Sequence, residues 1–169
     1  MDAMDAISSR RSIRKYTKEA VPEDIINQLL EAAMSAPSAG NEKPWHFIVV
    51  NDRQILDEIP KYHPYADALK HTPLAIVVCG DLNLEILEGF WLQDCSAATE
   101  NILIAAQAKG LGAVWLAIHP RQERVVVIQK LLGLPSYIMP LCVVAIGYPA
   151  EKKSRENRFD PSRIHQNVW

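Results

Sequence analysis

Four short apolar runs alternate along the chain with longer segments in which apolar residues recur every three or four positions. The runs cover residues 46–50, 74–80, 112–118 and 141–148, and valine, isoleucine and alanine dominate most of them. Continuous apolar runs of this length, bounded by turn residues, are typical of strands that are covered on both faces. We therefore predict four core strands.

Helices are predicted between these strands from the spacing of the apolar residues. Pro22 and the two acidic residues after it suit the first turn of a helix, which we expect to end before Pro37. Further helices are expected near residues 55–59 and over 121–132, although the valine run of the latter also suits a strand. The longest helix is predicted over 90–108. It is apolar over most of its circumference, which predicts burial in a core or a subunit interface.

Two segments lack a regular pattern. Residues 60–73 contain three prolines, which predicts a loop or a lid. Residues 149–169 are polar and charged and cannot form a core of their own, yet they end in aliphatic and aromatic side chains. We expect this tail to dock on another surface.

The order of elements predicts an α+β or a mixed α/β fold in a single domain over residues 1–169. The glycine-rich motif G-x-G-x-x-G does not follow any predicted strand, and the P-loop motif is absent. Dinucleotide-binding and P-loop folds are therefore not expected.

Composition excludes several classes of function. The 18 basic and 20 acidic residues nearly balance, which argues against a protein that coats nucleic acid. No apolar run approaches the roughly 20 residues of a membrane span. The three cysteines lie far apart and the histidines show no ligand spacing, so neither a disulfide framework, a metal site nor a catalytic triad is predicted. Free cysteines favour a reducing, cytoplasmic location.

Positive charge is nevertheless concentrated at residues 10–15, which read Arg-Arg-Ser-Ile-Arg-Lys. Like charges this close repel each other unless an anion compensates them. A guanidinium group pairs with two phosphate oxygens at once, and the serine hydroxyl adds a neutral donor. The segment therefore predicts a phosphate-bearing ligand. A solvated arm or a nucleic-acid contact is the alternative, which the near-neutral net charge and a second cluster of arginines at 155–158 disfavour.

Three segments in this order resemble the nitroreductase family of FMN-dependent oxidoreductases. They read R-R-S-I-R-K-Y at 10–16, S-A-P-S-A-G-N-E-K-P-W-H-F at 35–47 and G-L-G-A-V-W-L at 110–116. The stretch R-F-D-P-S-R-I-H at 158–165 and the terminal tryptophan are also similar to small members of that family. The resemblance covers nearly the whole chain. It implies an α+β fold with a central mixed, mainly antiparallel sheet of four to five strands flanked by helices, in an intertwined homodimer with FMN at the subunit interface.

The resemblance assigns the basic segment to the cofactor. It implies that Arg10 and Ser12 contact the FMN phosphate and that Arg11 reaches the ribityl chain or the pyrimidine edge. It places Arg14 near flavin N1 and O2. A cation there stabilises the negative charge that the ring gains on reduction.

Three other segments complete the implied site. The loop Pro37-Ser38-Ala39-Gly40-Asn41 covers the ring from the partner subunit, where small residues allow close approach of backbone and Asn41 supplies side-chain hydrogen bonds. Taken alone, this loop is more typical of an ordinary helix terminator, and the continuation Pro44-Trp45-His46-Phe47 favours the flavin interpretation. The backbone of Leu116 and Ala117 faces flavin N5, although larger members often carry an acidic residue and a glycine where this chain has Ala117 and Ile118. Arg155 and Arg158 complete the phosphate site.

The implied activity is transfer of a hydride from NADH or NADPH through flavin N5 to an oxidised acceptor such as a nitroaromatic or a quinone. No catalytic side chain is predicted. A specialised relative, such as a reductive dehalogenase or a flavin-fragmenting enzyme, is an alternative that the short 60–73 segment disfavours. A flavin-binding module without turnover is another. The expected partners are a second subunit, on which residues 149–169 dock, and a small-molecule acceptor, rather than nucleic acid or a membrane.

Overall fold

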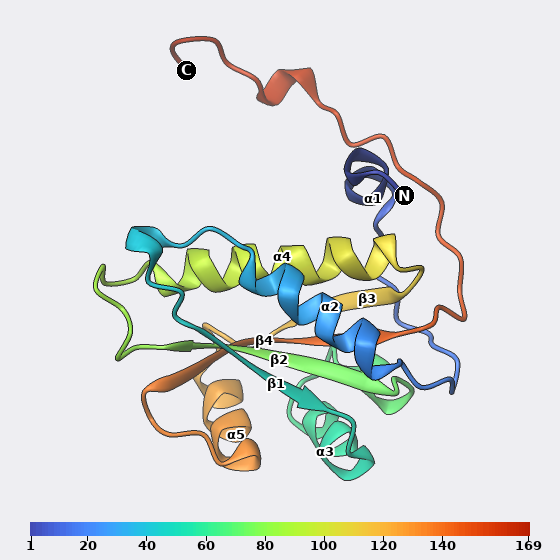
Figure 1. Ribbon diagram of the computed structural model, residues 1–169, viewed down its shortest axis with the longest axis vertical. Coiled ribbons are helices and arrows are strands. Elements are labelled where there is room, and N and C mark those ends of the chain that lie inside the picture. Colours follow the sequence, from blue (N-terminus) through green and yellow to red (C-terminus); the bar gives the residue numbers. More distant parts are fainter.

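The computed structural model describes residues 1–169 and is built on one four-stranded sheet (Figure 1). Its strands are β1 (Trp45–Val50), β2 (Leu74–Asp81), β3 (Gly112–Ala117) and β4 (Ile138–Gly147), in the order β1-β2-β4-β3. All four predicted strands are present. β4 begins earlier than predicted, because residues 138–140 pair with the end of β2.

The sheet is antiparallel throughout, which corrects the expectation of a mixed sheet. The single parallel pairing is an isolated bridge between Ser12 and Ala113. It joins the basic segment to β3 outside the four-stranded sheet. The α+β class is confirmed.

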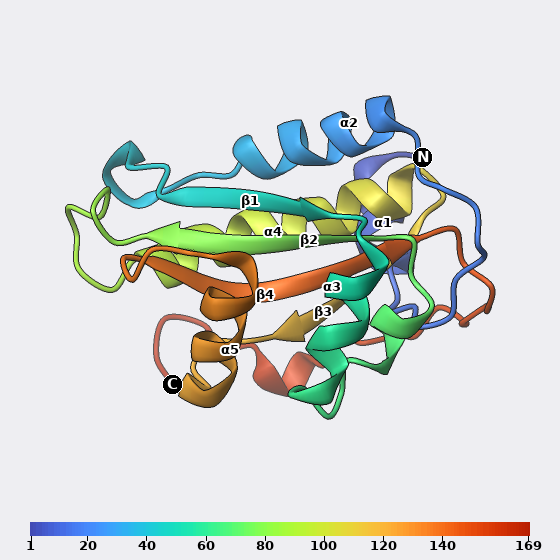
Figure 2. The same ribbon diagram turned by 90° about the horizontal axis from the view of Figure 1, so that it is seen from below.

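Helices cover both faces of the sheet, as Figures 1 and 2 show. On one face lie α2 (Glu23–Met34) and α4 (Trp91–Ala108), and on the other lie α3 (Arg53–Glu58) and α5 (Gln122–Leu132). The long helix α4 is buried along most of its length, as its sequence predicts. Residues 122–132 are helical rather than extended: Val125 and Ile128, three positions apart, pack under the sheet while Val126 faces solvent.

One helix was not predicted. The helix α1 (Ala3–Ser9) precedes the basic segment, and the side chain of Asp2 caps it by accepting from the amide of Asp5 at 3.0 Å. Only Ala6 of this helix is buried, so the sequence carries no apolar periodicity from which to predict it. It lies against the end of α4, where Gln107 donates to the hydroxyl of Ser9.

Residues 60–73 form an anchored loop rather than a free lid. Two short 3₁₀ turns, η2 (Ile59–Lys61) and η3 (Asp67–Lys70), lie within or at the start of it. Ala66 and Leu69 are completely buried in the core beneath the sheet. The loop therefore presents a fixed set of side chains.

The C-terminal tail follows the basic segment and then leaves the body of the molecule (Figure 1). The amide of Ala150 donates to the carbonyl of Lys15 at 2.8 Å, and the ammonium of Lys153 donates to the carbonyl of Ser12 at 2.6 Å. Beyond these contacts the tail is exposed, and Trp169 is 99% accessible. Docking of this tail on a partner stays a prediction.

Candidate functional site

The basic segment is held as an extended strap against β3. The amide of Ile13 donates to the carbonyl of Ala113 at 3.0 Å, and the Ile13 side chain is buried. A Cβ on Gly112 would lie 2.7 Å from the side chain of Ile13, so only glycine allows the strap to approach this closely. At the far end, the Tyr16 side chain is buried, and its hydroxyl lies 2.5 Å from the carbonyl oxygen of Ile13 and 3.2 Å from that of Ala145 on β4.

Three of the predicted phosphate ligands meet in one pocket, which we call the arginine pocket. It has a volume of about 750 Å³ and is lined by Arg10, Arg155 and Arg158 together with Glu100 and Glu156. Each carboxylate pairs with one of these arginines. Arg10 Nε lies 3.3 Å from the Glu100 carboxylate, and Arg158 Nε lies 3.3 Å from the Glu156 carboxylate. The structure thus brings the N-terminal and C-terminal arginines together.

Some arginine N–H groups in and beside this pocket have no hydrogen-bond acceptor. Arg10 Nε and Arg11 Nη1 are buried and form no hydrogen bond, although Arg10 lies within ion-pair distance of Glu100. A buried guanidinium N–H without an acceptor is costly. This donor set fits an anion with several acceptor oxygens, such as a phosphate.

Arg11 and Ser12 lie outside the arginine pocket. Arg11 lines a smaller pocket of about 310 Å³ beside the tail, and its Nη2 pairs with Glu156 at 2.5 Å. Ser12 lines none of these pockets in the single chain. Their implied contacts with the cofactor stay predictions.

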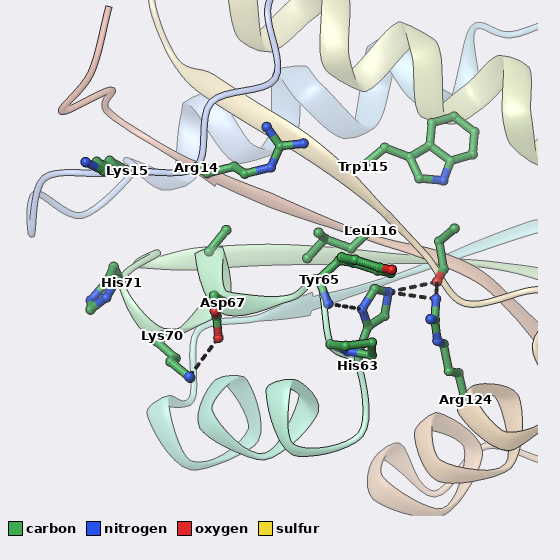
Figure 3. A pocket seen from close by; sticks show the side chains of 13 residues that line it. Arg14, Lys15, His63, Tyr65, Asp67, Lys70, His71, Trp115, Leu116 and Arg124 are labelled. Carbon is green, nitrogen blue, oxygen red and sulfur yellow. Dashed lines mark hydrogen bonds and ion pairs between the residues drawn. The ribbon is translucent and has the colours of Figure 1, made fainter.

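A second pocket lies where β3 ends, and we call it the β3 pocket (Figure 3). It has a volume of about 760 Å³. Arg14, Leu116 and Ala117 all line this pocket, and their implied contacts with the flavin stay predictions. The backbone under Arg14 is fixed, because the Arg14 amide donates to the carboxylate of Glu151 at 2.6 Å. That contact lowers the pKa of Glu151 below its usual value.

The small-residue loop lies elsewhere in the same chain. Ala39–Asn41 forms a 3₁₀ turn (η1) at the N-terminal end of α4, where the amide of Ala39 donates to Asp94 at 3.0 Å. The basic segment lies at the other end of α4, beside α1 (Figure 1). Pro37, Ser38 and the η1 residues line neither of the two pockets. Within one subunit, the loop is therefore separate from the other predicted site residues.

Sequence reasoning missed His63 and Arg124, which hold the end of β3 (Figure 3). His63 is only 4% exposed, and its Nε2 lies 2.9 Å from the carbonyl oxygen of Ala117. Its Nδ1 accepts from the amide of Tyr65 at 3.2 Å, so the proton is on Nε2, which donates to Ala117. Arg124 Nη1 donates to the same oxygen at 2.9 Å.

Burial lowers the pKa of His63, and the neighbouring Arg124 cation lowers it further against the opposing pull of the Ala117 carbonyl. The hydrogen bonds to Ala117 and from the Tyr65 amide favour the tautomer that carries its proton on Nε2. No motif marks this cluster in the sequence, because the histidine belongs to an irregular segment and lies 54 positions from Ala117.

A family model described as the nitroreductase family matches residues 7–71 and 61–148. The chain belongs to the nitroreductase family. None of the helices of this chain combines the length and apolar character that a membrane crossing needs.

Several similar proteins match this chain over its whole length or nearly so. A Methanothermobacter thermautotrophicus protein, provisionally named an NADH dehydrogenase/NAD(P)H nitroreductase, is 50% identical over 100% of this chain and 88% of its own. A crystal structure from Parabacteroides distasonis with the same provisional name has a TM-score of 0.96 and 43% identity, covering 99% of this chain and 98% of that one. A Desulfovibrio desulfuricans protein, provisionally named a nitroreductase and crystallised with FMN, has a TM-score of 0.86 and 31% identity, covering 100% and 98%.

Proposed function

We propose that this protein is an FMN-dependent oxidoreductase that moves two electrons from NADH or NADPH to a small oxidised acceptor such as a nitroaromatic or a quinone. The observation that carries this proposal is the pairing of two pockets at the two ends of one cationic strap: the arginine pocket beside Arg10 and the β3 pocket beside Arg14. The names of its relatives and the FMN complex of the Desulfovibrio desulfuricans protein support the same cofactor and donor.

The arginines and the strand end suit different parts of FMN. Arg10, Arg155 and Arg158 would hold the phosphate, which would supply acceptor oxygens to the buried Nε of Arg10 and to the exposed guanidinium groups of Arg155 and Arg158. Arg14 would lie at the pyrimidine edge of the ring, and the backbone at Leu116 and Ala117 would face its reactive edge. When bound, FMN accepts a hydride from the donor and delivers two electrons to the acceptor.

The reaction balances without a catalytic side chain. One NAD(P)H and one proton reduce a quinone to a hydroquinone and leave NAD(P)⁺, and solvent supplies the proton. The protein contributes position and charge. A guanidinium at Arg14 stabilises negative charge in the reduced state, while His63 and Arg124 hold the Ala117 peptide in place.

The complete site requires a second copy of the chain. The loop Pro37–Asn41 leads toward β1, which lies at the opposite edge of the sheet from β3, and the loop lines neither pocket of its own subunit. In a homodimer the loop of one subunit would cover the ring bound by the other. The exposed tail residues Phe159, Ile164 and Trp169 would be buried by the same association. We place the protein in the cytoplasm, because its three cysteines are free thiols and NAD(P)H is the electron donor.

The absorbance spectrum and the reduction of the purified protein test this function. We expect the bands of oxidised flavin, and bleaching of those bands when NADH or NADPH is mixed with the protein under anaerobic conditions. A colourless protein that does not take up added FMN, or flavin that neither donor reduces, would refute the activity.

The double substitution Arg10→Ala/Arg158→Ala tests the phosphate assignment. Each change removes a charge-assisted contact worth about 1.5–3 kcal/mol, so FMN affinity should fall at least about a hundredfold. The charge-matched control is Lys61→Ala/Lys130→Ala, which removes two cations outside both pockets and should retain FMN. Equal FMN retention after dialysis in the two variants would show that the phosphate binds elsewhere.

A further inference from the structure

Positive charge gathers at the mouth of the β3 pocket, beyond the residues proposed to hold FMN. The pocket is lined by four lysine or arginine side chains and a single acid, Asp67. A side pocket of about 380 Å³ adjoins it and shares Lys70 and His71 with it. The side pocket adds Lys18 and Arg53 and contains no acid. We call Lys15, Lys18, Lys70 and His71 the cationic rim.

The lysines of the rim are free to bind a ligand. Lys15 and Lys18 are exposed and form no ion pair in the structure. Lys70 pairs with Asp67 at 2.7 Å, but both groups are more than half exposed and such a pair is worth little. Arg53 differs from them, because it already pairs with Asp57 and donates to the carbonyls of Leu69 and Thr72.

FMN does not account for this charge. Its phosphate is assigned to the arginine pocket, and the reduced ring needs one cation, which Arg14 supplies. The whole chain carries a net charge of −2, so the rim is not part of a generally basic surface. The charges of Lys15, Lys18 and Lys70 on one side of a redox pocket repel each other and are tolerated best when an anion lies among them.

The side chains that line the β3 pocket indicate what kind of molecule carries the anionic group. Tyr65 and Trp115 line the pocket on the side toward β3, while Lys15 and His71 line the opposite side (Figure 3). Aromatic side chains suit a flat ring. The pocket thus offers a stacking surface at one end and positive charge at the other.

We propose that the cationic rim binds an anionic group of the second substrate. This group is a carboxylate, a sulfonate or a phosphate, and it belongs to a molecule whose flat redox-active ring stacks in the β3 pocket. This rests on the proposed function. Two sources supply such chemistry. One is an aromatic acceptor that carries an acid group, and the other is the 2′-phosphate of NADPH. Both place a negative charge at the rim while the redox-active ring lies on the flavin.

Binding calorimetry on the oxidised, FMN-loaded protein tests the rim directly. The probes are 4-nitrobenzoate and its neutral analogue 4-nitrobenzyl alcohol. The variant is Lys15→Gln/Lys18→Gln/Lys70→Gln, and the control Lys61→Gln/Lys109→Gln/Lys130→Gln removes the same charge outside the β3 and side pockets. We expect the rim variant to bind 4-nitrobenzoate about tenfold more weakly at low salt, with the neutral probe unchanged.

Stopped-flow reduction separates the donor from the acceptor. If the rim holds the 2′-phosphate, the rim variant will need about tenfold more NADPH for half-maximal flavin reduction while its response to NADH stays the same. If the rim holds the acceptor, the two donors will be unaffected and only the calorimetric affinity for 4-nitrobenzoate will fall. Either result supports the rim as an anion site and identifies its source.

The proposal is overturned if the rim variant and its control bind both probes equally and respond equally to both donors. A protein that holds no FMN, or whose flavin neither donor reduces, overturns the proposed function instead. FMN content is measured in the same samples, so the two failures are distinguishable.

Discussion

Substitution of Gly112 by alanine tests whether the contact between the strap and β3 positions the cofactor. A Cβ at residue 112 would lie 2.7 Å from Cβ and Cγ2 of Ile13 and 3.0 Å from its Cγ1. Ile13 is β-branched and 7% exposed, so its side chain cannot rotate away freely. The strap itself must therefore shift. Ile13 lies between residues 10–12 and residues 14–15 of the basic segment, so the shift moves the arginines on both sides of it.

The structure sets the size of the effect. Overpacking of this kind costs about 1–3 kcal/mol. For a chain of this length, that lowers the melting temperature by roughly 2–12 °C. The movement also weakens the hydrogen bond from Ile13 to Ala113 and displaces Arg14, so we expect FMN affinity to fall about tenfold or more, the equivalent of one lost contact to a charged group.

The assay combines FMN titration by fluorescence with thermal unfolding of the protein freed of FMN, since bound ligand itself raises the melting temperature. Gly110→Ala is the matched control. Gly110 has a φ of +75° and no atom within 4 Å of an added Cβ, so alanine there costs about 1–2 kcal/mol of backbone strain without touching the strap. We expect it to lower stability and leave FMN affinity unchanged. Normal FMN affinity in Gly112→Ala, despite reduced stability, would refute a positioning role for this contact.

Two further predictions concern the groups that fix the backbone of the β3 pocket. His63→Phe removes the donor to Ala117 and leaves the amide of Tyr65 without its acceptor, so it should destabilise the protein by about 1–3 kcal/mol and shift the flavin reduction potential; a destabilised variant with an unchanged potential would limit His63 to a structural role. Glu151 has a lowered pKa because it accepts from the Arg14 amide, so its stabilising effect is complete above the ordinary pKa of 4.5 and is lost as the pH falls through the lowered value. The difference in melting temperature between the wild type and Glu151→Gln should therefore be largest near neutral pH and disappear in acid, and a constant difference across that range would contradict this account.

Much of the fold follows from local pattern. Continuous apolar runs defined the four strands, because a strand covered on both faces has no polar positions to alternate. The long helix α4 was evident from its nearly uniform apolar circumference. α1 could not be found this way, since a helix that buries one alanine has no periodicity. The apolar pattern also left the direction of every strand pairing open, because parallel and antiparallel partners draw on the same apolar residues, and only the family resemblance implied a mainly antiparallel sheet.

The site divides in the same way. By itself, the sequence determined that positive charge is concentrated at residues 10–15 and again near the C-terminus, because charge density can be counted along a chain. Only the tertiary structure decided that Arg10 and Arg158 share one pocket while Arg14 faces another, and that the loop at η1 is held away from both. The tertiary structure also brings His63 and Arg124 within hydrogen-bond distance of the same carbonyl oxygen, that of Ala117 at the end of β3. Such contacts join residues that are distant in sequence, and the packing of the whole chain, rather than any local preference, brings them together.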